Sequence, residues 1–280
     1  MSATLAHFDL LALAGCGTFA DVWQVRDRRT GHVCAIKQLR SEWLDRPAAR
    51  QILRNEADVG RRVSSEFVVK VFDAVLDSSI PHIVLEWLTG TTLEAKLAGG
   101  QRLPCREALW VARQCASGMH ALLIAGYTHG DIKPSNLFLC DDGIVKLIDL
   151  GFARPDQLAA PDLCGAGGHL TGTPEYLAPE TLVPGHPGGI ARDVYSLGIT
   201  LYRMLTGVLP FQGESIAEIL KQHQTALPAK LRSLAPEVPR EVGEFVHRLL
   251  SKQPLRRGGG LTWLIHELIG LELSVLPTPN

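Results

Sequence analysis

Hydrophobic and polar positions alternate in short runs over the first third of the chain. β-branched and aromatic residues concentrate in four segments between Phe8 and Leu88, namely ADVWQVRD, VCAIKQL, VVKVFDAVL and HIVLEWL. Runs of this composition, bounded by polar turn residues, predict β-strands. One interval, at about residues 47–63, follows a helical pattern instead and begins with a proline. The pattern predicts a small sheet that carries one helix.

A helical period replaces this pattern after Thr92. Between residues 106 and 126 one helical face collects the apolar side chains of Leu109, Ala112, Cys115, Met119, Leu122 and Leu123. Further helices are predicted at residues 194–205, 241–250 and 261–271. The Gly/Pro/Ala-rich segment at residues 154–174 has no period and is predicted to be a long functional loop. The second part of the chain is therefore mostly helical, and the fold class is α+β.

Two strand-like runs, LFL and IVKLI, flank the turn sequence CDDG at residues 140–143. Asp-Asp-Gly is hairpin turn chemistry, so the outer ends of the two runs are predicted to lie together. Asp131 and Asn136 precede the first run, and Asp149 follows the second. The hairpin therefore gathers a carboxylate base, an amide oxygen and a second carboxylate. Phosphoryl transfer assisted by Mg²⁺ requires a set of this kind.

Two earlier motifs fit the same chemistry. Gly15 and Gly17 lie between two strand-like runs, which predicts a glycine-rich hairpin whose backbone approaches phosphates closely. Lys37 lies on a strand, on the face opposite Ile36, where its ammonium group can reach a nucleotide. A buried lysine needs a counter-ion, and Glu56 on the predicted helix is the preferred candidate because Ile52 and Leu53 place it on an apolar face. Asp58 and Glu42 are the competing candidates.

The composition indicates which cellular compartment and which binding partners to expect. The 280 residues carry a net charge of -1 with 46% apolar content, which indicates a globular protein and gives no basic patch for nucleic acid. Six scattered cysteines without a C-x-x-C pair favour a cytoplasmic location, and no apolar run is long enough to span a membrane. LLALAGC, ending at Cys16, resembles a lipoprotein signal. This interpretation is disfavoured because residues 1–20 contain no Lys or Arg.

The order and spacing of these motifs resemble the eukaryotic-type (Hanks-type) Ser/Thr protein kinase family over nearly the whole chain. The glycine loop, Lys37, HGDIKPSN, DLG and GTPEYLAPE carry the resemblance. It implies a bilobal fold, with a small antiparallel sheet and one main helix in the N-lobe and a larger, mostly helical C-lobe. It also implies one kinase domain over residues 1–280, with the N-lobe and hinge at 1–88, the C-lobe at 89–280 and the activation segment at 149–180.

The resemblance assigns roles residue by residue. Asp131 would orient the acceptor hydroxyl, Lys133 would neutralise the γ-phosphate, and Asn136 with Asp149 would hold Mg²⁺, with Mn²⁺ as an alternative. Lys37 and Glu56 complete the catalytic group. Leu85 resembles the gatekeeper before a hinge at residues 86–88. The implied ATP-binding residues are Gly15, Gly17, Val22, Ala35, Lys37, Glu86, Leu88 and Phe138.

Residues of the C-lobe complete the resemblance. Glu180 and Arg257 would pair, and Asp193 would anchor the catalytic loop. Thr173 resembles the threonine that contacts the catalytic aspartate, and Thr171 and Thr173 are the candidate phosphosites. Lys133 in D-x-K-P-x-N favours Ser/Thr over tyrosine kinases.

Three positions depart from the family pattern. Ala20 stands where a third glycine is expected, and Leu150 replaces the usual Phe of DFG, an apolar exchange that should leave the metal ligand intact. Gly130 replaces the arginine that in many kinases binds a phosphorylated activation loop. We therefore expect activity to depend only weakly on phosphorylation of Thr171 or Thr173.

Alternatives and partners follow from the same motifs. H-G-D also occurs in aminoglycoside-type small-molecule kinases, and an ATP-binding pseudokinase scaffold is a non-enzymatic alternative. The docking loop at residues 171–180 favours protein substrates, and the intact lysine, base and metal ligands favour an enzyme with autophosphorylation. Family members that select arginine in their substrates carry acidic residues just after the hinge and just before the metal-binding Asn. Thr92 and Ser135 stand at these positions here, so the sequence does not predict a preference for arginine. The sequence does not decide whether the chain forms a homodimer. A bare domain rich in Ala, Leu and Gly favours a bacterial source.

Overall fold

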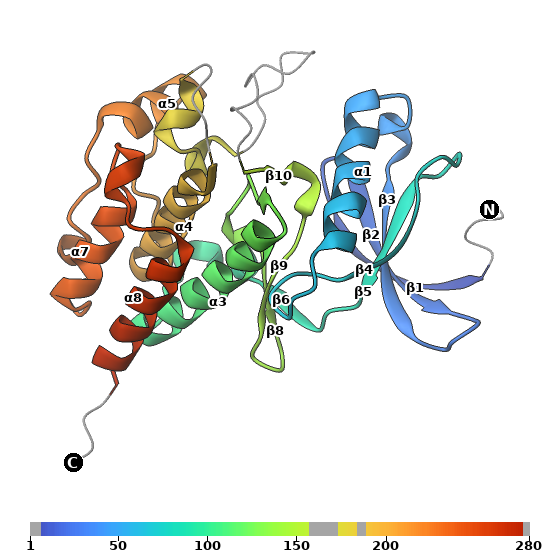
Figure 1. The fold of residues 1–280 in the computed structure, drawn as a ribbon, viewed down its shortest axis with the longest axis horizontal. Coiled ribbons are helices and arrows are strands. Elements are labelled where there is room, and N and C mark those ends of the chain that lie inside the picture. The colour runs from blue at the N-terminus through green and yellow to red at the C-terminus, as the bar shows by residue number, and fades with distance from the viewer. Residues whose placement is uncertain (1–6, 157–172, 184–188, 277–280) are drawn as a thin grey trace.

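The computed structural model describes residues 7–156, 173–183 and 189–276, and these residues form two lobes joined by a short connection (Figure 1). The smaller lobe contains a five-stranded antiparallel sheet of order β1-β2-β3-β5-β4. Its elements are β1 (Phe8–Cys16), β2 (Ala20–Asp27), β3 (Val33–Leu39), α1 (Pro47–Arg62), β4 (Val71–Val75) and β5 (His82–Glu86). The predicted small sheet with one helix is confirmed.

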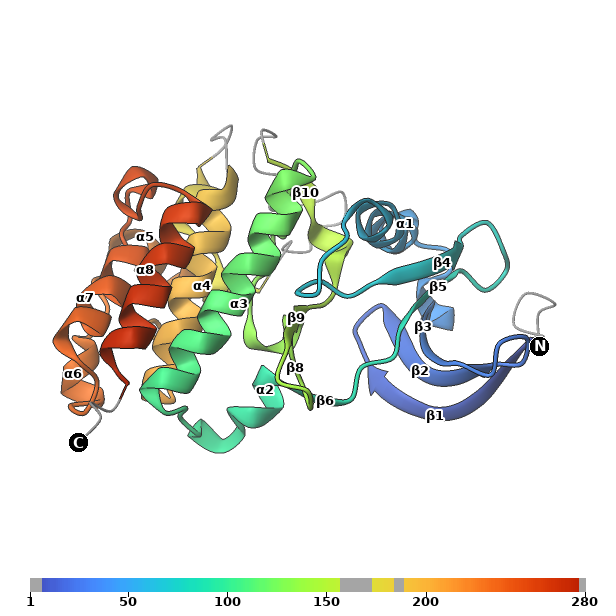
Figure 2. The ribbon, with the colours of Figure 1, turned by 60° about the horizontal axis from the view of Figure 1, so that its bottom comes forward.

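Helix α1 packs on one face of this sheet (Figure 2). It begins at a proline, which suits the first helical position because its missing N–H would have no intrahelical partner. Its buried positions Ala49, Leu53 and Ala57 contact sheet residues that include Ala35 and Ile83. Glu56 lies on the same buried face, so burial of the apolar side chains also carries a carboxylate toward the sheet.

The larger lobe is mostly helical. Its helices are α2 (Leu93–Lys96), α3 (Cys105–Ile124), α4 (Gly189–Thr206), α5 (Ile216–Thr225), α6 (Leu231–Leu234), α7 (Arg240–Leu249) and α8 (Leu261–Ser274). Its short strands are β6 (Gly90–Thr92), β7 (Tyr127–Thr128), β8 (Leu137–Cys140), β9 (Val145–Leu147) and β10 (Arg154–Pro155). β6, β8 and β9 form one small antiparallel sheet, and β7 pairs with β10.

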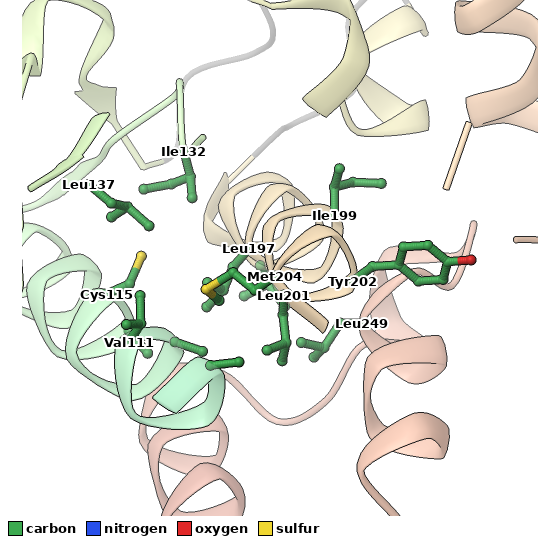
Figure 3. Close-up of a cluster of buried hydrophobic side chains, with 14 of the residues drawn as sticks. Val111, Cys115, Ile132, Leu137, Leu197, Ile199, Leu201, Tyr202, Met204 and Leu249 are labelled. Atoms are coloured by element: carbon green, nitrogen blue, oxygen red, sulfur yellow. The ribbon is translucent and has the colours of Figure 1, made fainter. Parts of the chain in front are cut away.

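Helix α4 is the centre of the C-lobe. It is buried over almost its whole length after the first turn, as expected for a helix that other elements surround. Figure 3 shows Leu197, Leu201 and Met204 of α4 between Val111 and Cys115 of α3 and Leu249 of α7. The core of this lobe therefore forms where α3, α4 and α7 meet, and it includes Ile132, which follows Asp131 in the chain.

The helices differ from their predicted extents in understandable ways. α4 begins at Gly189 rather than Val194, because its first turn carries Arg192 and Asp193 and lacks apolar periodicity. α5 and α6 were not predicted, and α5 follows the N-cap residue Ser215, whose side chain accepts a capping hydrogen bond from the Glu218 N–H. The predicted loop includes the strand β10 at its start, and its residues 157–172, with Cys164 and Thr171 among them, lie outside the described residues.

No helix in the described part of the chain is both long enough and apolar enough to span a membrane.

Candidate active site

The predicted catalytic hairpin is formed by β8 and β9. Leu137 pairs with Leu147 and Leu139 with Val145, and the Gly143 N–H donates to the Cys140 carbonyl at 2.9 Å to close the turn. At the open end the Ile148 N–H donates to the Asn136 carbonyl at 3.0 Å. This bond places the residues before β8 beside those after β9. Asn136 and Asp149 are therefore brought to one end of the hairpin, as the sequence predicted.

Gln114 on α3 supports the hairpin from the C-lobe. Its side-chain oxygen accepts a hydrogen bond from the Val145 N–H at 3.0 Å, and its amide nitrogen donates to the Gly143 carbonyl at 3.3 Å. The side chain is 5% exposed, so these bonds replace water for two backbone groups of the turn. Gln114 thus fixes the hairpin to the central helices.

Asp131 is at the centre of a polar network. Its Oδ2 lies 2.7 Å from the Lys133 Nζ and accepts a hydrogen bond from the Asn136 Nδ2 at 2.9 Å. The Lys133 Nζ also donates to the Thr173 Oγ1 at 2.6 Å, and that hydroxyl lies 3.3 Å from the Asp131 Oδ1. Four predicted site residues therefore meet, and a carboxylate stands beside an ammonium group and a threonine hydroxyl.

Lys37 bridges the two lobes. Its Nζ lies 2.6 Å from the Glu56 Oε2 on α1 and 3.0 Å from the Asp149 Oδ1. Burial alone would lower the pKa of Lys37, but the charges of Asp149 and Glu56 raise it above its usual value. Burial opposes the charge of Asp149 as well, and Lys37 more than offsets it, so the pKa of Asp149 is lowered. Lys37 and Asp149 are thus both held in their charged forms.

Glu56, rather than Asp58 or Glu42, is the counter-ion of Lys37. Its side chain is almost completely buried. Burial raises the pKa of Glu56 to about 7, against the opposing effect of Lys37. This carboxylate is therefore the member of the cluster that takes up a proton most readily near neutral pH.

The catalytic loop is anchored by Asp193 on α4. Its Oδ2 accepts a hydrogen bond from the His129 N–H at 2.7 Å, and its Oδ1 accepts one from the Gly130 N–H at 2.9 Å. Both carboxylate oxygens are engaged, and the residue is buried. The predicted anchoring contact is therefore present, and it joins the loop that carries Asp131 to the central helix.

Gly130 adopts a backbone conformation that suits glycine. Its φ is +80°, and a Cβ at this position would lie 2.6 Å from the Phe152 carbonyl oxygen. A side chain here would meet both left-handed strain and a close backbone neighbour. Glycine therefore fits this backbone position without strain, and it leaves the loop without a cationic side chain here.

The DLG segment is held by α1. The Asn55 Nδ2 donates to the carbonyls of Gly151 at 2.9 Å and Ala153 at 2.7 Å. Leu150 is fully buried, which agrees with its expected packing role. Asp149 is the one non-glycine residue with positive φ in the described part of the chain, at 64°. This strained conformation, supported by Asn55 and Lys37, turns the carboxylate toward the open end of the hairpin.

The predicted nucleotide residues lie along the N-lobe sheet and at its junction with the C-lobe. Gly15 pairs with Val22 across the β1–β2 hairpin, and the Gly17 N–H closes the loop by donating to the Ala20 carbonyl at 2.9 Å. A Cβ on Gly17 would lie 2.9 Å from that oxygen, so glycine is required there for a close turn. A cavity lined by Gly17, Lys37 and Asp149 opens beneath the loop.

Other predicted nucleotide residues occupy the inner face of the N-lobe and the hinge. Ala35 and Leu85 are buried in the cluster under α1, with Val22 and Leu88 packed against it, and Phe138 lies on β8. The Glu86 side chain has an additional structural role, because it accepts hydrogen bonds from the Lys70 N–H at 2.8 Å and the Lys146 Nζ at 2.9 Å. The hinge is thereby tied to β9.

Glu180 and Arg257 form the predicted pair within the C-lobe, at N–O distances of 2.6 and 2.7 Å. Both side chains are buried, and Arg257 also donates to the carbonyls of Ala191 and Ser251. This pair supports the end of the docking segment and does not enter the Asp131 network. Of the two candidate phosphosites, Thr173 lies in the Asp131 network, and Thr171 is outside the described residues.

The donor set fits a hard divalent cation bound together with phosphates. In the described residues no group of three or more His, Cys, Asp or Glu side chains is arranged to hold a metal by itself. The Asn136 Nδ2 is engaged with Asp131, which leaves the Asn136 Oδ1 available, and the Asp149 side chain keeps 35% exposure. One amide and one carboxylate oxygen suit Mg²⁺, which commonly takes its remaining ligands from water and substrate phosphates.

Sequence reasoning missed Asn55 and Gln114, which hold the DLG segment and the β8–β9 turn. Asn55 stands between Arg54 and Glu56, and Gln114 follows Arg113, so neither is distinguished from its polar neighbours in the sequence. An amide side chain that turns inward needs hydrogen-bond partners, since burial without a partner is costly. The sequence alone does not say which backbone groups the partner provides.

The two lobes, the lysine–glutamate pair and the aspartate–lysine–asparagine loop define a kinase-type phosphotransferase fold and site. A protein-family model for the protein kinase domain matches residues 8–269. The chain belongs to the protein kinase domain family.

Similar bacterial proteins agree with this assignment. The chain is 33% identical over 255 residues to the serine/threonine-protein kinase drp72 of Corynebacterium efficiens, covering 89% of this chain and 48% of that protein. It is 31% identical over 256 residues to the serine/threonine-protein kinase PknA of Mycobacterium tuberculosis, covering 90% and 58%. A probable serine/threonine-protein kinase of Streptomyces coelicolor is 31% identical over 252 residues, covering 89% and 37%. The chain thus spans 37% to 58% of the length of these relatives.

Proposed function

We propose that this chain transfers the γ-phosphoryl group of ATP to serine or threonine hydroxyls of proteins, and that it also phosphorylates itself. The network of Asp131, Lys133 and Thr173 is the observation that carries the proposal. It sets a carboxylate beside a cation at the start of the segment that resembles a protein-docking loop. The named activity of the bacterial relatives supports the same class of reaction.

Each residue has a separate task in this proposal. Asp131 accepts a hydrogen bond from the incoming hydroxyl and orients its oxygen toward the phosphorus. Lys133 donates to the transferring phosphoryl oxygens, where negative charge is present. Lys37, fixed by Glu56, holds the nucleotide phosphates from the N-lobe side. The contacts among these groups support the proposal, since preformed donors and charges need little reorganisation when substrate binds.

Asn136 and Asp149 would hold Mg²⁺, with Mn²⁺ as an alternative. The ion, when bound, would neutralise phosphate charge and help to orient the nucleotide. Gly15 and Gly17 would cover the phosphates, while Val22, Ala35 and Phe138 would contact the base. The backbone at Glu86 and Leu88 would bind the adenine edge.

The proposal is tested by incubating the chain with labelled ATP and Mg²⁺ and measuring label on the chain, on a basic protein and on an aminoglycoside. We expect label on protein serine or threonine. Label on the aminoglycoside alone would identify a small-molecule kinase, and nucleotide binding without transfer would identify a scaffold. Asp131→Asn should abolish transfer and leave ATP binding within about twofold, because the base contacts the acceptor rather than the nucleotide.

A further inference from the structure

The glycine-rich loop between β1 and β2 contacts the segment that follows β3. This segment consists of Arg40 and a short 3₁₀ helix, Ser41–Trp43, which lies before α1. The Arg40 N–H donates to the Phe19 carbonyl of the loop at 3.0 Å, and the Trp43 N–H donates to the Arg40 carbonyl at 2.9 Å. The backbone therefore places two large side chains, those of Arg40 and Trp43, beside the loop. No role assigned above involves either of them.

The Arg40 side chain reaches the tip of the loop. Its Nη1 donates to the Gly17 carbonyl at 3.3 Å, and its Nη2 lies 2.8 Å from the exposed Glu42 carboxylate. The Gly17 N–H donates to the Ala20 carbonyl, so both backbone polar groups of Gly17 are bonded. A glycine held at its N–H and its carbonyl has fewer conformations available than one in a free turn. Arg40 thus restrains the most adaptable residue of the loop.

Charge also links Arg40 to the loop. The Asp21 Oδ1, directly after the loop on β2, is buried and accepts no hydrogen bond from the described residues. The Arg40 Nε lies 4.0 Å from this oxygen. Attraction over this distance offsets part of the cost of burying the carboxylate. Without Arg40, an unpaired negative charge would stand at the end of a loop that is proposed to cover phosphates.

An aromatic contact holds the same loop from the other side. The ring centroids of Phe19 and Trp43 lie 4.8 Å apart, with an interplanar angle of 82°. Edge-to-face pairs of this kind are favourable beyond the burial of their apolar area. Both rings are half-buried and pack against the apolar cluster under α1, which includes Ala49 and Leu53. The loop is therefore attached to the cluster beneath the helix that carries Glu56.

The loop held in this way covers the cavity that contains Lys37 and Asp149. Gly17 and Phe19 line that cavity, whereas Arg40 and Trp43 are absent from its described lining. Backbone N–H groups of a glycine-rich loop bind phosphates only when the loop lies close to them. Arg40 and Trp43 can therefore influence a nucleotide through the position of the loop, without touching the nucleotide.

We propose that Arg40 and Trp43 are positioning residues that hold the glycine-rich loop over the phosphates of the bound nucleotide. This role rests on the proposed use of ATP. A loop that is already restrained loses less conformational freedom when a ligand binds beneath it. Loss of either contact should therefore weaken the binding of ATP and ADP. Adenosine has no phosphates for the loop to cover, so its binding should stay the same.

Calorimetry in the presence of Mg²⁺ measures ATP and ADP binding, and displacement of ADP measures adenosine binding. Arg40→Gln and Trp43→Leu should each weaken ATP and ADP binding by about threefold to tenfold and change adenosine binding by less than about twofold. Arg54→Gln is the matched control, because it breaks an exposed ion pair with Asp77 away from the loop, and it should bind all three ligands as the unchanged chain does. Equal weakening for all three ligands, or unchanged ATP binding in both variants, overturns the proposal.

A double substitution tests whether Trp43 acts through the loop. Phe19→Leu removes the same aromatic contact from the loop side. If Trp43 acts through Phe19, the variant that carries both substitutions binds ATP within about twofold of the weaker single variant, because the contact is lost only once. Losses that multiply in the double variant would show that Trp43 does not act through this ring and would overturn its assignment.

Folding of each variant is checked by circular dichroism and thermal midpoint. Should Arg40→Gln or Trp43→Leu unfold, Arg40→Lys and Trp43→Phe take their place, with a weakening of about twofold to threefold expected for ATP and ADP alone. ATP binding equal to that of the unchanged chain in both folded replacements would count against the proposal.

Steady-state kinetics give a separate measurement. The KM for ATP should rise in Arg40→Gln and Trp43→Leu, while the KM for a protein acceptor stays near that of the unchanged chain. A chain without transferase activity still gives the nucleotide titrations, so failure of the proposed transfer reaction is seen separately. An unchanged chain that binds adenosine as tightly as ADP would show that the loop makes no use of the phosphates, and this result would overturn the positioning role.

Discussion

Arg257 and Glu180 share two short contacts inside the C-lobe, with the Nη1–Oε1 distance at 2.6 Å and the Nη2–Oε2 distance at 2.7 Å. Removing one partner leaves the other charge buried without compensation. We expect Arg257→Ala to lower the free energy of unfolding by about 3–5 kcal/mol, the range for a broken buried pair. Arg240→Ala breaks the exposed pair with Glu244 and should lower the free energy of unfolding far less, because water solvates both charges of that pair. Chemical denaturation measures both, and similar losses would contradict the buried pair's importance.

Substitutions of Gly130 and Gly126 distinguish the effect of backbone strain from that of a steric clash. Both have positive φ, at +80° and +86°, but a Cβ on Gly126 meets nothing within 4 Å. Gly126→Ala should therefore cost about 1–2 kcal/mol in unfolding free energy from left-handed strain alone. Gly130→Ala should cost more and reduce turnover, because its Cβ pushes against the Phe152 carbonyl next to DLG. Denaturation and steady-state rates test this, and equal effects of the two substitutions would show that the Phe152 backbone yields freely.

Protonation of Glu56 should set the acid limb of the activity profile. As the pH falls through about 7, Glu56 takes a proton and releases its hold on Lys37, so kcat/KM for ATP should fall. Glu56→Gln should lower the activity and remove this limb.

Protonation of Glu56 lowers the activity but should raise the stability of the folded chain. A carboxyl pKa raised in the folded state means that the folded chain holds a proton that the unfolded chain releases. The free energy of unfolding from this group therefore increases as the pH falls from 7 toward the unfolded pKa of 4.5. Denaturation of the chain and of Glu56→Gln at pH 8 and pH 5 measures the difference. Parallel pH dependence in both would exclude Glu56 as the titrating group.

His223 should make the C-lobe sensitive to acid. It is fully buried, its Nδ1 lies 2.9 Å from the Tyr195 hydroxyl, and burial together with the charge of Lys252 lowers its pKa to about 4. The unfolded chain binds this proton near pH 6.5, so stability is lost as the pH falls from 6.5 to 4. Between pH 7 and pH 5 this histidine should account for about 2 kcal/mol of unfolding free energy.

The control for this prediction is His223→Gln, which keeps an acceptor for Tyr195 and removes the titration. Urea denaturation at the two pH values should show a smaller acid loss in this variant than in the unchanged chain. An equal acid loss would place the titrating group elsewhere.

Local chemistry made much of the candidate site predictable. The CDDG turn sets the hairpin register, and the register alone brings Asn136 beside Asp149. The apolar face of α1 selects Glu56 over Asp58 because one face of the helix is buried. These conclusions need only periodicity and turn geometry.

Other parts depend on contacts between distant segments. Gln114 and Asn55 look like ordinary helical residues until the backbone groups they bind are known. Arg192 lies before the predicted start of the helix at residue 194, and its position near Arg154 follows only when β10 and α4 are placed together. Long-range geometry of this kind has no local sequence pattern, so it was not predicted.

The Gln114 contacts with the β8–β9 turn also mean that one part of the site is attached to the C-lobe and another part to the N-lobe. Gln114 of α3 and Asp193 of α4 hold the segments that carry the residues proposed to bind the metal and the acceptor hydroxyl. Lys37 lies on β3 of the N-lobe sheet and contacts Glu56 of α1. A lobe rotation that moves Lys37 away from the end of β9 therefore lengthens the Lys37–Asp149 separation, whereas the Asp131–Asn136 contact lies within the C-lobe. That single distance, 3.0 Å here, serves as a gauge of lobe closure.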